Sequence, residues 1–93
     1  MSGTQRPAFG KGVRLRHETA GAMLLVPEGT LALNATAAAA LDLVDGRRCV
    51  EEIAALLATE FDVAPERARE EVDALLARLA ERRFVVMQSE TDA

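Results

Sequence analysis

The chain has 93 residues, which suits one small domain with a single hydrophobic core. Apolar residues make up 49%, and eighteen alanines and twelve leucines among them favour helices around a thin core. A single cysteine excludes an intrachain disulfide, and one cysteine with one histidine cannot close a protein zinc site. With three phenylalanines and no tryptophan or tyrosine, base stacking on single-stranded nucleic acid is not expected.

The net charge of −4 is unevenly distributed along the chain. Residues 1–17 carry four basic side chains and no acid, whereas residues 18–46 and 47–93 each carry a net charge of −4. This pattern is either ordinary solvated surface or a basic strip for an acidic peptide or partner protein. No apolar run is long enough to span a membrane and no signal peptide opens the chain, so we expect a cytoplasmic protein without membrane contact.

The first third of the chain predicts a flexible segment followed by strands. Residues 1–12 contain three glycines and a proline, and we expect them to be a flexible lead-in. Residues 13–18 alternate apolar and polar side chains, 22–26 form a short apolar run, and 30–33 alternate again. With turns between them, these segments predict a three-stranded antiparallel meander.

The rest of the chain has helical periodicity. The first helix is expected to start after Asn34, an N-cap residue, and to end at Asp45-Gly46. The second is expected to start at Cys49, a weak cap in the register of a capping box, and the third at Pro65. Residues 84–86 either add a short strand or simply pack, and residues 88–93 read as a tail. The apolar stripe of the third helix consists of Ala68, Val72, Leu75, Leu76 and Leu79.

The predicted order is therefore β-β-β-α-α-α, an α+β domain of a three-stranded antiparallel meander followed by a three-helix bundle. The last two helices, joined by a short link beside a small sheet, make the arrangement winged-helix-like. We expect residues 13–87 to form this single domain.

Catalysis by this chain alone is not expected. The only histidine, His17, reads as a half-buried strand residue, and Cys49 has no base nearby in sequence. The Gly10-Lys11-Gly12 run lacks the strand and helix of a phosphate loop. We therefore predict neither enzymatic activity nor a metal or cofactor.

DNA binding and peptide binding remain as readings of a winged-helix-like domain. The third helix carries four arginines against five acids between Glu66 and Arg82, which disfavours contact with phosphates. The third strand, Thr30 to Leu33, has no lysine or proline to block its edge, so an extended peptide could add there as a further strand.

Three stretches of the chain follow the ordered motifs of a known family. The run MLLVPEGTLALN from Met23 to Asn34 is similar to the LL-x-PE-G-x-x-x-LN stretch of the PqqD family. The segments from Ala38 to Gly46 and from Val50 to Leu57 are similar to its "iL-x-l-x-DG" and "t-v-x-e-I-x-x-x-L" patterns. The resemblance covers roughly residues 6–86, and Cys49 departs from it where the family tends to have threonine.

The resemblance implies a peptide chaperone of pyrroloquinoline quinone (PQQ) biosynthesis. Such a protein binds the precursor peptide PqqA by strand addition and presents it to the radical SAM enzyme PqqE. Carried onto this chain, the third strand and the third helix would form the two walls of the peptide site. The implied peptide-binding residues are Thr30, Leu31, Ala32, Leu33, Val72, Leu75, Leu76 and Leu79.

Two alternatives stay open at this point. The chain could recognise the leader of another peptide-modifying system, or it could be a winged-helix DNA-binding regulator. We expect a monomer or a weak homodimer, because an open sheet edge can also pair with a second copy.

Overall fold

The computed structural model describes residues 3–89. Two antiparallel sheets and three helices make up this part of the chain. The strands are β1 (Arg6–Phe9), β2 (Arg14–Glu18), β3 (Gly21–Val26), β4 (Gly29–Leu33) and β5 (Val85–Gln88), and the helices are α1 (Ala35–Asp42), α2 (Val50–Phe61) and α3 (Pro65–Glu81).

The first sheet has the order β2-β3-β4 and confirms the predicted meander. Both of its hairpins have two-residue loops, so Glu18 pairs with Gly21 and Val26 pairs with Gly29. Gly29 has φ of 150°, in the region that glycine tolerates better than other residues, directly after Pro27 and Glu28. The three strands followed by three helices confirm the predicted α+β class.

In the second sheet, β5 confirms the alternative of a short strand near residues 84–86, whereas β1 and its pairing with β5 were not predicted. Arg6 pairs with Gln88 and Phe9 with Val85, so the two ends of the chain lie side by side. The expected flexible segment 1–12 therefore contains a strand, and Gln88 belongs to a strand rather than to the tail. Of that tail, residues 90–93 lie outside the described residues. A pairing between strands about eighty residues apart leaves no local pattern in the sequence.

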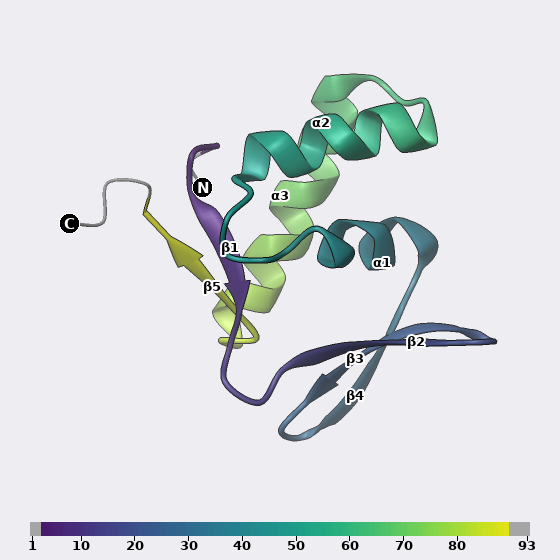
Figure 1. The fold of residues 1–93 in the computed structure, drawn as a ribbon, viewed down its shortest axis with the longest axis vertical. Coiled ribbons are helices and arrows are strands. Elements are labelled where there is room, and N and C mark those ends of the chain that lie inside the picture. The colour runs from purple at the N-terminus through teal and green to yellow at the C-terminus, as the bar shows by residue number, and fades with distance from the viewer. Residues whose placement is uncertain (1–2, 90–93) are drawn as a thin grey trace.

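The winged-helix likeness requires one small sheet beside the helices, whereas the five strands form two sheets. In Figure 1, the β2–β3–β4 sheet lies below α1, while β1 and β5 run beside α3. The carbonyl oxygens of Pro7 and Gln5 accept bonds from the N–H groups of Gly46 and Val50, which ties β1 to the connection between α1 and α2.

The helices begin where their caps predicted, but α1 ends early. The Asn34 side chain accepts from the Ala37 N–H at 2.8 Å, and Cys49 is the N-cap of α2. Helix α1 ends at Asp42 instead of Asp45-Gly46. The Asp45 side chain instead accepts from the backbone N–H groups of Arg47 and Arg48, at 2.8 and 2.9 Å.

A single core joins the sheet to the helices. The predicted α3 stripe is buried, and the largest fully buried side chains include Leu24, Leu41, Ile53 and Leu76. Leu56 on α2 lies outside this core and is 47% exposed. The packed core leaves β4 at the margin of the sheet, close to the start of α1.

Candidate functional site

Strand β4 has one free edge. It pairs with β3, and among residues 3–89 no strand pairs with its other side. Residues that flank a two-residue hairpin loop exchange both of their backbone hydrogen bonds, and pairing then alternates along the strands. The N–H groups of Leu31 and Leu33 therefore point to β3, whereas those of Thr30 and Ala32 point to the free edge.

The other hairpin gives the same alternation. Its loop places Gly21, Met23 and Leu25 of β3 in bonds to β2, so the intervening residues of β3 bond to β4. The side chains of β4 alternate as well: Thr30 and Ala32 are exposed, and Leu31 and Leu33 are partly buried. The free edge thus presents two N–H groups and no charged side chain.

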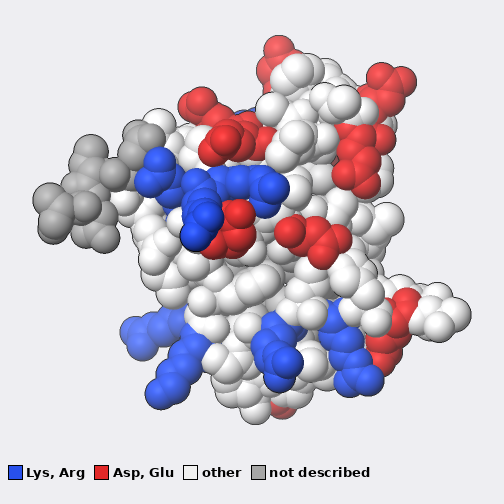
Figure 2. All heavy atoms as spheres, viewed as in Figure 1, with Lys and Arg blue, Asp and Glu red and all other residues white. Residues whose placement is uncertain are grey.

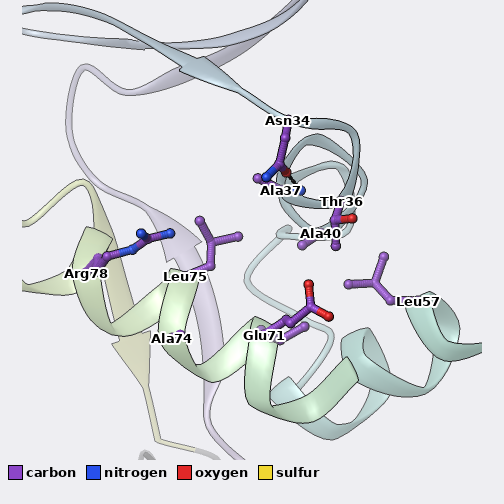
Figure 3. Close-up of a pocket in the computed structure, with 10 residues that line it drawn as sticks. Asn34, Thr36, Ala37, Ala40, Leu57, Glu71, Ala74, Leu75 and Arg78 are labelled. Carbon is purple, nitrogen blue, oxygen red and sulfur yellow. Dashed lines mark hydrogen bonds between the residues drawn. The ribbon is translucent and has the colours of Figure 1, made fainter. Parts of the chain in front are cut away.

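A hollow lies between α1 and α3, where β4 runs into α1. Its volume is about 190 Å³. Figure 3 shows Leu75, Arg78 and Glu71 of α3 on one side of it and Asn34, Ala37 and Ala40 on the other. A smaller hollow shares Thr36, Leu57 and Glu71 with it and extends the depression to the link between α2 and α3.

Another hollow, of about 90 Å³, lies at the opposite end of β4. Thr30 and Leu31 line it from the strand, and Arg82 and Phe84 line it from the residues after α3. The chain therefore has depressions at both ends of β4, each with a wall from α3 or its C-terminal extension. We call the free edge of β4 with these depressions the β4–α3 groove.

The eight residues implied by the resemblance fall into three groups. Thr30 and Leu31 line the hollow at the start of β4, and Val72 and Leu75 line the hollow at its end. Ala32 and Leu33 belong to the strand but line neither hollow. All four apolar residues of α3 are buried, but Leu76 and Leu79 line neither hollow, so we leave these two out of the groove.

Several groove residues were missed by the sequence reasoning. Asn34 and Ala37 from α1, and Glu71, Arg78 and Arg82 on or just after α3, line the two hollows. The sequence spacing of the groove residues on the α3 side could have revealed them. Glu71, Leu75, Arg78 and Arg82 follow one another at four, three and four positions, which places them on one helix face.

Charged side chains of both signs share the face drawn in Figure 2. Acidic side chains are numerous over its upper part, where a group of basic side chains lies beside them, and further basic side chains project from its lower part. Of the residues that line the groove, Glu71 is paired with Arg67, and Arg82 lies 4.0 Å from Glu28.

Two carboxyl groups with shifted pKa values lie on the α1–α2 side. The backbone N–H of Cys49 donates to Glu52 Oε1 at 2.9 Å and holds the pKa of Glu52 below its usual value. The backbone N–H of Arg48, helped by that of Arg47, lowers the pKa of Asp45 in the same way. Both carboxylates accept hydrogen bonds from backbone N–H groups in the residues that lead into α2. Their role is therefore to stabilise the fold there.

His17 lies on a strand, β2, as predicted, but it is more exposed than predicted. Its side chain is 59% exposed rather than half-buried, and Nε2 lies 2.7 Å from Asp42 Oδ1. This contact connects β2 to α1. Within residues 3–89, no three His, Cys, Asp or Glu side chains gather closely enough to hold a metal ion. None of the helices in the described part of the chain has the length and apolarity needed to cross a membrane.

Comparison with known proteins places this fold and groove in a family. The family model described as "Coenzyme PQQ synthesis protein D (PqqD)" matches residues 21–85. The chain belongs to the PqqD family. The match includes β3, β4 and all three helices, and thus both walls of the groove.

Named relatives agree with this assignment. The chain is 48% identical over 66 residues to a PqqA binding protein of Klebsiella pneumoniae, covering 69% of this chain and 72% of that protein. It is 39% identical over 87 residues to the PqqA binding protein of Stutzerimonas stutzeri, covering 91% and 94%. It is also 39% identical to the bifunctional coenzyme PQQ synthesis protein C/D of Methylorubrum extorquens, covering 91% of this chain but 23% of that protein.

Solved structures share the PqqD fold. The PqqD part of Methylobacterium extorquens PqqCD, described as a stand-alone recognition element for ribosomally synthesised and modified peptides, superposes with a TM-score of 0.80. It has 38% identity, and the match covers 92% of this chain and 94% of that one. A lasso peptide synthetase B1 complexed with its leader peptide shares the fold, with a TM-score of 0.76 at 22% identity over 87% of this chain and 98% of that one.

Proposed function

We propose that this chain is a peptide chaperone that binds the precursor peptide PqqA as an added strand on β4. The supporting observation is the β4–α3 groove, because an extended peptide needs free N–H and C=O groups beside side-chain pockets. Thr30 and Ala32 provide free N–H groups at the outer edge of β4. The hollows lined by Leu31 and Leu75 provide the side-chain pockets. The names of the relatives supply the identity of the peptide.

The chain would act by binding alone, without catalysis, and would present PqqA to the radical SAM enzyme PqqE in the cytoplasm. Strand addition fits presentation, because it orders one part of a peptide and leaves the rest free for an enzyme. The same edge would be used either for PqqA or for weak self-pairing. Saturating peptide should therefore favour the monomer.

Amide hydrogen exchange tests the proposed binding mode. In the free chain, the amides of Leu31 and Leu33 should exchange slowly because they bond to β3, whereas those of Thr30 and Ala32 should exchange fast. Saturation of isotope-labelled chain with synthetic PqqA should protect Thr30 and Ala32. The outward amides of β2, Leu15 and His17, are the internal control and should stay fast.

Binding without protection of Thr30 and Ala32 would contradict strand addition and indicate docking along the helices instead. Absence of binding to PqqA, together with binding to another leader peptide, would favour the alternative peptide-modifying system. A parallel titration with duplex DNA tests the regulator alternative.

A further inference from the structure

Arg78 is an exposed arginine at the edge of the larger hollow. It lies one turn beyond Leu75 on α3, and both line the hollow together with Asn34 and Ala37 from the start of α1. In Figure 3 its side chain extends from α3 beside Leu75, on the side of the helix that faces Asn34. It therefore stands beside the path that a peptide would take past the C-terminal end of β4.

The other charged groups of the groove already have partners. Glu71 Oε2 lies 3.1 Å from Arg67 Nε, so its charge is balanced from its own helix. Arg82 lies near Glu28 and also over the Phe84 ring, at 5.4 Å from its centroid. Arg78 makes no ion pair or hydrogen bond with any residue of the described range 3–89.

Because, within residues 3–89, Glu71 and Arg82 are paired and Arg78 is not, the groove has an excess of positive charge at Arg78. Small or apolar side chains of the hollow, among them Ala37, Ala74 and Leu75, share its lining with the polar side chains of Asn34, Thr36 and Glu71. An ion pair formed against the apolar part of this lining is screened less by water than one surrounded by solvent on all sides. The planar guanidinium can also hold a carboxylate through two parallel hydrogen bonds.

We infer that Arg78 selects an acidic side chain of the bound peptide, next to an apolar side chain that enters the larger hollow. Because alternate side chains of an added strand face the same way, these two peptide residues are two positions apart. The ligand class is thus an extended peptide with an Asp or Glu and an apolar residue at i and i+2, bound past the end of β4. This inference rests on the proposed function and adds the chemistry that the groove recognises.

The test is a set of calorimetric titrations with synthetic PqqA. One series of peptides replaces each Glu by Gln and each Asp by Asn, one at a time. The chain variants are Arg78→Gln, Arg78→Lys and, as a matched control, Arg47→Gln. Arg47 is exposed, lies between α1 and α2 and lines neither hollow of the groove.

We expect Arg78→Gln to weaken PqqA binding about five- to tenfold, as suits a partly exposed charge-assisted contact. Arg78→Lys should bind with intermediate affinity, because lysine keeps the charge but cannot form the two parallel hydrogen bonds of a guanidinium. Arg47→Gln should bind like the unchanged chain. One peptide replacement should weaken binding to the unchanged chain by the same factor and have no effect on Arg78→Gln.

Equal binding by Arg78→Gln and the unchanged chain would overturn the inference while leaving the proposed function intact. A loss that is the same for every peptide of the series would overturn it too, because no single acid would then be coupled to Arg78. Failure of the unchanged chain to bind PqqA would overturn both proposals. Even if an Arg78 variant is poorly folded, a peptide series in which no single replacement weakens binding to the unchanged chain would overturn the inference.

Discussion

Strands β2 and β4 are the two margins of the same sheet, yet they present very different edges. Four of the five β2 residues can carry a charge, namely Arg14, Arg16, His17 and Glu18, and their side chains are exposed. Strand β4 carries no charged residue at all. Charged side chains on an edge oppose pairing with another chain, so β2 is protected against added strands and β4 is left open.

The two margins also differ in what lies beside them. The β2 margin is connected to α1 through His17 and Asp42, and none of the described hollows contains a β2 residue. The β4 margin has a hollow at each end. A free edge is common in small sheets, and the difference here teaches that the side chains beside an edge decide whether pockets accompany it.

The largest effect should come from a proline at an inward N–H of β4. Leu31→Pro removes a donor that bonds to β3, and we expect a loss of about 2–3 kcal/mol in the free energy of unfolding. Urea denaturation followed by circular dichroism measures this loss. A stability equal to that of the unchanged chain would mean that the register assigned to β4 is wrong.

A proline at the next position should separate folding from binding. Ala32→Pro removes an outward donor, so the chain should stay folded while its affinity for PqqA falls about tenfold or more. Calorimetric titration measures the affinity. His17→Pro removes the corresponding outward donor of β2 and should leave the affinity unchanged, and Ala32→Gly keeps the donor and should cost little.

If His17→Pro weakens binding as much as Ala32→Pro does, the contrast between the two margins is wrong. The peptide would then contact both sides of the sheet, or the loss would come from the fold rather than from the edge. Heteronuclear spectra of both variants tell these two explanations apart.

Removing basic side chains from β2 should allow this strand to pair with a second copy of the chain. In the double variant Arg14→Thr, Arg16→Thr, β2 loses its basic side chains, and two copies can approach edge to edge. We expect self-association with a dissociation constant on the order of millimolar, about −4 kcal/mol, measured by sedimentation equilibrium. A variant that stays monomeric at that concentration would show that charge is not what protects β2.

A stabilising change remote from both margins should leave them unaffected. Cys49 is the N-cap of α2, and Cys49→Thr places a hydroxyl acceptor there, so we expect a gain of about 0.5–1 kcal/mol. Thermal melting measures the gain, and the affinity for PqqA should not change. A higher affinity would indicate that overall stability, rather than the β4 edge, limits peptide binding.

Low pH should destabilise the folded chain through Glu52 at the start of α2. Because the pKa of Glu52 is lowered in the folded chain, its contribution to stability is complete above the ordinary glutamate pKa. This contribution falls as the pH drops from there and is lost below the lowered pKa. Thermal melts in acid should therefore show a weaker decline for Glu52→Gln than for the unchanged chain, and an equal decline would contradict the assignment.

Local patterns in the sequence determined much of this protein. Alternation over residues 13–18 and 30–33 specified two strands of the meander, and Asn34, Cys49 and Pro65 marked the starts of the three helices. The stripe from Ala68 to Leu79 specified the buried face of α3. The family followed from ordered motifs between Met23 and Leu57, within the range that the family model matches. All of these signals act between residues that are close in the chain.

Only the tertiary structure decided what depends on distant parts of the chain. The pairing of β1 with β5 joins the two ends, and a stretch as short as Arg6–Phe9 has no periodicity of its own to reveal it. The division of the α3 stripe into groove and core was equally hidden. Val72, Leu75, Leu76 and Leu79 are all apolar, and the position of α1 decides which of them meet a hollow. Arg78 became a candidate for recognition only when every neighbouring charge could be seen with its partner, since a sequence lists charges without their separations in space.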